Sequence, residues 1–109
     1  MKVLTVKPYP ETQTALLPIN RDFVVKYDPE LYYLIDDYHW FAKKSFHCWY
    51  AVAWTNVNGK RKLLRMHHLV NSTPKDLVCH HINGDTMDNR IANLQNISEF
   101  EHAKYFSYR

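Results

Sequence analysis

VCHHINGDTMDNRIANLQNISEFEH, residues 78–102, contains the signals for two strands and a helix in succession. Residues 77–82 form a short apolar run that ends at Asn83-Gly84, a dipeptide typical of turns. Residues 85–93 are polar and predict a loop with a helical turn, and residues 94–97 predict a second short strand. The sequence therefore predicts a strand, loop, strand and helix in the last third of the chain.

The helix is predicted from a capping box at Ser98 and Glu101, in which each side chain can bond to the backbone of the other residue. A helix should therefore begin near Glu99. Its apolar residues are spaced by three and predict a buried stripe of Phe100, Ala103 and Phe106.

Upstream of this unit the sequence predicts mainly β structure. Residues 22–27 and 48–55 are rich in strand formers, and residues 29–40 begin with a proline that suits one or two helical turns. Asn58-Gly59 predicts a tight hairpin, with residues 61–66 returning as the partner strand. Trp40 is expected in the core.

The chain of 109 residues fits one domain, and we expect an α+β fold with a small antiparallel sheet before the C-terminal unit. Residues 1–20 contain three prolines and predict an N-terminal arm, residues 21–75 a basic β-rich part, and residues 76–109 the strand–strand–helix unit. The only cysteines, Cys48 and Cys79, could form one bridge, but two free thiols are favoured. No signal peptide or membrane-spanning run is visible, so we expect a soluble cytoplasmic protein.

Charge is distributed unevenly along the chain. Between Asp37 and Asp76 there is no acidic residue, but there are seven lysines and arginines and four histidines. Such a segment fits a polyanion such as nucleic acid, with a solvated basic face as the alternative. The interleaved aromatic residues Trp40, Trp49, Tyr50 and Trp54 favour nucleic acid slightly, although aromatic residues of a sheet more often belong to the core. The hairpin residues expected to contact DNA phosphates are Lys60, Arg61, Lys62 and Arg65.

The C-terminal unit carries groups suited to phosphodiester hydrolysis. That reaction needs a base to deprotonate water, and a histidine can serve near neutral pH. It also needs positive charge on the transition state and the leaving oxygen, which one bound cation can supply. His80, His81, Asn93 and His102 are the candidate residues.

The order His-His-Asn-His over two strands and a helix resembles the HNH endonucleases, in particular the branch of phage and intron-associated homing enzymes. Residues 81–85, HINGD, match the first part of the motif, Asn93-Leu94 the second, and His102 falls at the third position. Met66-His67 and residues 36–40 also resemble segments that precede the motif. The resemblance covers about residues 20–107, and residues 78–102 are its distinctive part.

The resemblance implies a ββα-metal fold and a DNA endonuclease that leaves 5′-phosphate and 3′-hydroxyl ends. It implies that His81 is the general base, that Asn93 holds the loop, and that His80 and His102 bind one divalent metal ion. The family usually has aspartate where this chain has His80. A neutral imidazole favours Mn, Ni or Zn over Mg more than aspartate would. The implied partner is double-stranded DNA in a bacterial or phage-infected cell.

Other interpretations remain open from the sequence. Cys79, His80, His81 and His102 could nominally form a structural zinc site, although adjacent residues are poor tetrahedral ligands. Asn93 alone could be an ordinary cap. Arg90 and His67 are further candidates for contact with DNA, and Asn89 could contact phosphate or belong only to the loop. A DNA-binding module that has lost cutting is the rival function, and a homodimer could supply specificity.

Overall fold

The structure is a computed structural model that describes residues 14–106, with side chains to residue 104. It is α+β, with three small antiparallel sheets and short helices, as expected. The strands are β1 (Ala15–Pro18), β2 (Val24–Tyr27), β3 (Phe41–Ser45), β4 (Cys48–Val57), β5 (Lys60–Arg65), β6 (Val78–His81) and β7 (Leu94–Ile97). The α-helices are α1 (Tyr32–Ile35), α2 (Met66–Val70) and α3 (Glu99–Phe106), and the 3-10 helices are η2 (Asn20–Asp22), η3 (Pro29–Leu31) and η4 (Ile91–Asn93). No helix among the described residues is long and apolar enough to cross a membrane.

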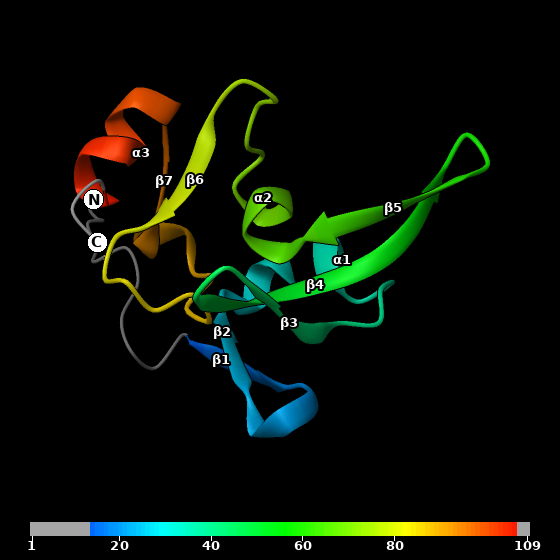
Figure 1. Ribbon diagram of the computed structural model, residues 1–109. Coiled ribbons are helices and arrows are strands. Elements are labelled where there is room, and N and C mark those ends of the chain that lie inside the picture. The colour runs from blue at the N-terminus through cyan, green and yellow to red at the C-terminus, as the bar shows by residue number, and fades with distance from the viewer. Residues whose placement is uncertain (1–13, 107–109) are drawn as a thin grey trace, which may run out of the picture.

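The β4–β5 hairpin forms as predicted and projects away from β6, β7 and α3 (Figure 1). Its turn has positive φ at both central residues, 53° at Asn58 and 79° at Gly59. Two-residue hairpin turns of this kind favour Asn-Gly because both residues tolerate that conformation. β3 pairs with the other edge of β4 and was not predicted, since residues 41–45 combine two lysines with few strand formers.

The N-terminal segment differs from the expected arm. Residues 15–18 form β1, which pairs antiparallel with β2, and residues 1–13 lie outside the described part. Pro18 is compatible with this strand because β1 is an edge strand of a two-stranded sheet, where proline is tolerated. β2 lies beside the loop that joins β6 and β7 (Figure 1), and Val25 of β2 and Leu17 of β1 contribute to the core.

The C-terminal unit has the predicted order, with β6 and β7 paired antiparallel and α3 following directly. The capping box is confirmed at the start of α3. The Glu101 amide donates to Ser98 Oγ at 3.0 Å, and the Ser98 amide donates to Glu101 Oε1 at 3.3 Å. Two donors that the first helical turn leaves unpaired are thereby satisfied.

The predicted buried stripe on α3 is wrong. Phe100 is 76% exposed, Ala103 is exposed, and the side chain of Phe106 lies outside the described residues. The helix instead turns His102 toward β6, where its ring meets that of His80. Three-residue apolar spacing on so short a helix does not decide which face packs, because tertiary contacts outweigh it.

One cluster of buried apolar side chains joins the N-terminal, central and C-terminal parts. Trp40 belongs to it as expected, and its indole Nε1 donates to the Ile35 carbonyl at 2.8 Å. The buried members are Val25, Ile35, Trp40, Ala42, Ala51, Ala53, Met66, Val70, Cys79, Met87 and Leu94. The C-terminal unit therefore packs on the same core as the sheet that precedes it.

The loop between β6 and β7 is fastened to β2 by backbone hydrogen bonds. The Lys26 amide donates to the Met87 carbonyl at 2.9 Å, and the Asn89 amide donates to the Lys26 carbonyl at 2.8 Å. The Ile91 amide donates to Asp28 Oδ2 at 2.8 Å. These bonds fix the loop against a strand about sixty residues earlier in the chain.

Inside the loop, the side chain of Asp88 is 0% exposed and accepts four hydrogen bonds. Arg90 Nε and Nη2 each donate at 2.7 Å, the Arg90 amide donates at 3.4 Å, and Asn83 Nδ2 donates at 3.1 Å. Burial alone would raise the pKa of Asp88, but the hydrogen bonds and charge of Arg90, aided by Asn83, hold that pKa below its ordinary value. Asp88 is therefore a charged, fully paired group at the centre of the loop.

We expect Asp88→Asn to lower the free energy of unfolding by about 3 kcal/mol at neutral pH, because it breaks a buried ion pair. The folded pKa of Asp88 is depressed, so its contribution is complete above the unfolded pKa and is lost as the pH falls through the folded pKa. The difference between variant and wild type should shrink on acidification. Urea unfolding at neutral and acidic pH measures it. The exposed Asp37→Asn is the control, and equal stability of wild type and Asp88→Asn would refute the assignment.

Candidate functional site

A cavity of about 240 Å³ lies where the C-terminal unit meets the central sheet, and five histidines line it. They come from three elements, with two on α2, two on β6 and one on α3. The five are His67, His68, His80, His81 and His102. Tyr50 of β4 and Arg65 of β5 complete the side formed by the sheet. We refer to this cavity as the histidine pocket.

His81, the predicted general base, is only 6% exposed and is held from two sides. Its Nε2 lies 2.8 Å from Oδ1 of Asn89, and its ring centre lies 4.7 Å from that of His67. An amide oxygen only accepts hydrogen bonds, so Nε2 carries the proton. The lone pair of the neutral ring is then on Nδ1, the nitrogen that could take a proton from water.

Burial lowers the pKa of His81 from its ordinary value. The hydrogen bond to Asn89 and the charges of Asp85 and Asp88 act in the opposite direction without reversing the shift. The imidazole is therefore neutral near pH 7, as a general base must be before it accepts a proton.

His80 precedes His81 on β6, and the two rings have different neighbours. His80 lies beside His102, with ring centres 5.9 Å apart, whereas His81 lies beside His67 and Asn89. Alternation along a strand accounts for this separation. Both nevertheless line the histidine pocket, because β6 ends at His81 and the chain turns at Gly84, whose φ is 80°.

The pair of His80 and His102 fits two ligands of one metal ion. Two imidazoles that bind one ion through nitrogens at about 2.1 Å place their ring centres roughly 5 to 6 Å apart. Burial, followed by the neighbouring His102, lowers the pKa of His80 and favours the neutral form that a metal needs. Within residues 14–104 no three His, Cys, Asp or Glu side chains are grouped to hold an ion by themselves. An ion held here would keep positions for water and phosphate.

This arrangement argues against the structural zinc alternative. The Cys79 thiol donates to the His67 carbonyl at 3.5 Å and accepts from Asn71 Nδ2 at 3.8 Å. Burial raises the pKa of Cys79, so the thiolate that zinc requires is disfavoured. Both cysteines are free thiols, as expected.

Asn93 ties together the two ends of the loop that follows His81. Its Oδ1 accepts from the Asn83 amide at 2.9 Å, and its Nδ2 donates to the Asp88 carbonyl at 2.9 Å. Its own carbonyl accepts from the Ile82 amide at 2.8 Å. Asn93 is buried and uses both its donor and its acceptor, which an ordinary cap residue does not need to do.

His67 is a buried neighbour of the base. Its ring stacks on Tyr50 with centres 5.4 Å apart, and its Nδ1 has no hydrogen-bond partner among the described residues. Burial, and then the charges of His81, His68 and Arg65, lowers the pKa of His67 to about 2. His67 is therefore neutral, and its contact with DNA stays a prediction.

The cationic candidates occupy different environments. Arg65 lines the histidine pocket, whereas Lys60, Arg61 and Lys62 lie toward the exposed tip of the hairpin. Arg90 is engaged with the buried carboxylate of Asp88, which gives it a structural role in the loop. Its predicted contact with phosphate remains untested.

Sequence reasoning does not identify the roles of two residues near His81, one of which lines the pocket. Asn89 is a phosphate contact or loop residue by sequence, yet its side chain is the hydrogen-bond partner of His81. Tyr50 is only a strand residue by sequence, yet it lines the pocket and stacks on His67. Neither position has a local signal, because both contacts join distant parts of the backbone.

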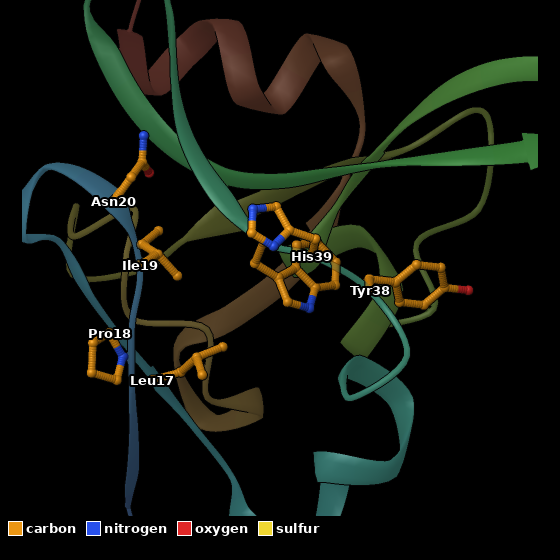
Figure 2. Close-up of a pocket in the computed structure, with 7 residues that line it drawn as sticks. Leu17, Pro18, Ile19, Asn20, Tyr38 and His39 are labelled. Atoms are coloured by element: carbon orange, nitrogen blue, oxygen red, sulfur yellow. The ribbon is translucent and has the colours of Figure 1, made fainter.

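A second cavity of about 390 Å³ lies apart from these groups. Figure 2 shows it between residues 17–20 and the segment that carries Tyr38 and His39. Its walls are mostly apolar, and it has one imidazole and no acidic side chain. We therefore place the chemistry in the smaller histidine pocket.

Residues 71–104, which include β6, β7 and most of α3, match the family model of the HNH endonucleases. We refer to this matched segment, residues 71–104, as the HNH unit. No curated protein and no solved structure matches the chain. The match includes His80, His81, Asn93 and His102. Tyr50 and His67 also line the histidine pocket, but they lie outside the matched residues.

The hydrogen bonds of Asn93 generate a prediction about the loop between β6 and β7. Asn93→Ala should expose the Asn83 amide, which loses its acceptor, and lower the free energy of unfolding by about 1–3 kcal/mol. Asn93→Asp retains an acceptor for Asn83 and should keep that amide protected. Amide hydrogen exchange of the three proteins measures this. The Ile82 amide is the internal control, because it bonds to the backbone of residue 93. Unchanged protection of Asn83 in Asn93→Ala would contradict the arrangement.

Proposed function

We propose that the chain is a metal-dependent endonuclease that hydrolyses phosphodiester bonds of double-stranded DNA, with His81 as the general base. The observation that carries the proposal is the position of His81 in the histidine pocket. Its Nε2 lies 2.8 Å from Asn89 Oδ1, and the imidazoles of His80 and His102 line the same cavity. Burial also lowers the pKa of His81. The match of residues 71–104 to the HNH endonucleases supports nuclease chemistry.

Each residue has one task in this proposal. His81 Nδ1 takes a proton from the attacking water while Asn89 keeps Nε2 protonated. Asn93 holds the loop so that the imidazole of His81 keeps its direction. His80 and His102 would hold one divalent cation, which would neutralise charge on the phosphate and the leaving 3′ oxygen. Phosphate oxygens and waters would fill its remaining positions.

The packing around His81 limits how the ring can move. His67 and Tyr50 lie beside it, with ring centres at 4.7 and 6.2 Å, and Asn89 is hydrogen-bonded to its Nε2. A general base needs such orientation because proton transfer requires hydrogen-bond distance to the water. We infer that Asn89 and His67 are positioning residues for His81 and do not themselves react. This activity is expected in the cytoplasm of a bacterial or phage-infected cell.

The first test removes the base. His81→Ala should lower the cleavage rate by about 10²–10⁴-fold and leave DNA affinity nearly unchanged, because the base acts on water. Supercoiled plasmid, assayed for nicked and linear products, reports cleavage, and fluorescence anisotropy with a duplex reports binding. His39→Ala is the matched control, since it removes an imidazole from the other cavity. Full activity of His81→Ala would overturn the assignment, and wild-type protein that binds without cutting would support the rival DNA-binding module.

The second test concerns the metal ion. EDTA should stop cleavage, and Mn or Ni should restore it at least as well as Mg because His80 is a softer ligand than aspartate. His80→Asp should shift the preference toward Mg. His102→Ala should weaken metal binding, measured by calorimetry, so that excess metal partly restores cleavage, whereas Asn93→Ala should keep its metal affinity and stay slow. Cleavage that persists in EDTA would refute the one-metal mechanism. If excess metal restores cleavage by Asn93→Ala and not by His102→Ala, the roles assigned to Asn93 and His102 are reversed.

A further inference from the structure

The sheet formed by β3, β4 and β5 has two faces of different character. Cross-strand partners in an antiparallel pair project to the same face, and successive residues alternate. Ala42, Ala51 and Ala53 share one face by this register, and all three belong to the buried core. That face is the inner face. The opposite, outer face carries Lys43, Ser45, Tyr50, Val52, Trp54, Arg61, Leu63 and Arg65.

The same register divides the cations of the sheet into two equal groups. Lys43 pairs with Tyr50, Arg65 with Val52, and Arg61 with Asn56, which places these three cations on the outer face. Lys44, Lys60 and Lys62 pair with Trp49, Val57 and Thr55 and belong to the inner face. All six side chains are exposed. The run Lys60-Arg61-Lys62, uniform in sequence, is therefore split between opposite faces.

The outer face is continuous with the histidine pocket. Ser45, Tyr50 and Arg65 line that pocket, and the same three residues also line a small depression of about 30 Å³ on the outer face. Lys43, Val52 and Leu63 complete the depression. Val52 is only 2% exposed although it points away from the core, so the long side chains around it cover it. A chain of contacts thus leads from the imidazoles onto the sheet.

Beyond the depression, Arg61 and Trp54 form a pair on the outer face. The guanidinium carbon of Arg61 lies 4.2 Å from the centre of the Trp54 ring, and Trp54 is 45% exposed. This cation–π contact holds Arg61 against the outer face. Arg61 and Arg65 are four residues apart, or about 13 Å along a strand, which corresponds to roughly four nucleotides at about 3.4 Å per step of one DNA strand.

We propose that the outer face is the track for the DNA backbone, with Arg65, Lys43 and Arg61 contacting phosphates from the histidine pocket toward the hairpin tip. Lys44, Lys60 and Lys62 lie on the opposite face and do not contact the DNA. The proposal rests on the proposed nuclease function and revises the expectation that the whole hairpin run binds phosphate. Charge complementarity supports it, because no acidic residue occurs between Asp37 and Asp76 to repel the duplex.

The test compares two triple variants that remove the same charge from opposite faces of one sheet. The outer variant is Lys43→Gln/Arg61→Gln/Arg65→Gln, and the inner variant is Lys44→Gln/Lys60→Gln/Lys62→Gln. Both are made in His81→Ala protein so that binding is measured without cleavage. The salt dependence of binding to a short duplex of mixed sequence is measured by fluorescence anisotropy, and thermal unfolding confirms that both variants fold.

The outer variant should lower the salt slope by about 2.7, because each duplex phosphate that the protein no longer neutralises reduces the slope by about 0.9. The inner variant should keep nearly the full slope. Equal reductions would show that only the net charge matters, a larger reduction in the inner variant would place DNA on the other face, and no reduction in either would remove the sheet from the interface. Each of these results overturns the proposal. If the wild-type protein binds DNA but does not cut it, the proposed nuclease function is refuted, whereas the salt slopes can still support the outer face as the DNA-binding surface.

Discussion

The buried carboxylate of Asp88 is the group on which the geometry of the HNH unit depends. The chain folds back between His81 and Leu94 through the twelve residues 82–93, and the packing of this loop leaves several of its polar groups away from water. Asp88 satisfies the donors of Arg90 and Asn83, while its carbonyl accepts from Asn93. A buried charge costs several kcal/mol unless it is paired in this way. Because the pairing is complete, the loop can present His81 at one fixed place.

That loop is not supported by the HNH unit alone. Lys26 and Asp28 of the N-terminal part hold its backbone, and His67 and Tyr50 form one side of the pocket around His81. These residues all precede the matched segment 71–104. The site is therefore built at a junction, and the sheet that carries the cations is joined directly to the imidazoles. In the proposed function, such a junction would bring the DNA-docking surface and the general base together.

Four of the five histidines of the pocket are shifted toward the neutral form. Imidazoles in one small cavity would repel one another if they were protonated, and burial disfavours charge. Burial is the first cause of the lowered pKa of His67, His68, His80 and His81. Neutral rings offer lone pairs, which suit a base that takes a proton and ligands that accept a cation. Positive charge is supplied instead by Arg65 at the rim.

The amino-acid sequence by itself determined the local elements and the chemical groups. Asn58-Gly59 specified the hairpin, Ser98 and Glu101 specified the start of α3, and the spacing of His81, Asn93 and His102 indicated the HNH unit. Each of these signals lies within a short segment, where backbone conformation and nearby hydrogen bonds decide the outcome. The sequence does not predict β1 and β3, because their residues have weak strand propensity and the two strands depend on pairing with β2 and β4.

Only the tertiary structure decided which groups meet. In the folded chain His81 is hydrogen-bonded to Asn89, and Arg90 forms an ion pair with Asp88. His102, and not Phe100, faces β6. Arg61 and Lys62 lie on opposite faces of the sheet. None of these outcomes follows from residue type, because each depends on the register of strands and on packing between segments far apart in the chain. Side chains along a strand alternate between the two faces of the sheet, so neighbouring cations of β5 lie on opposite faces.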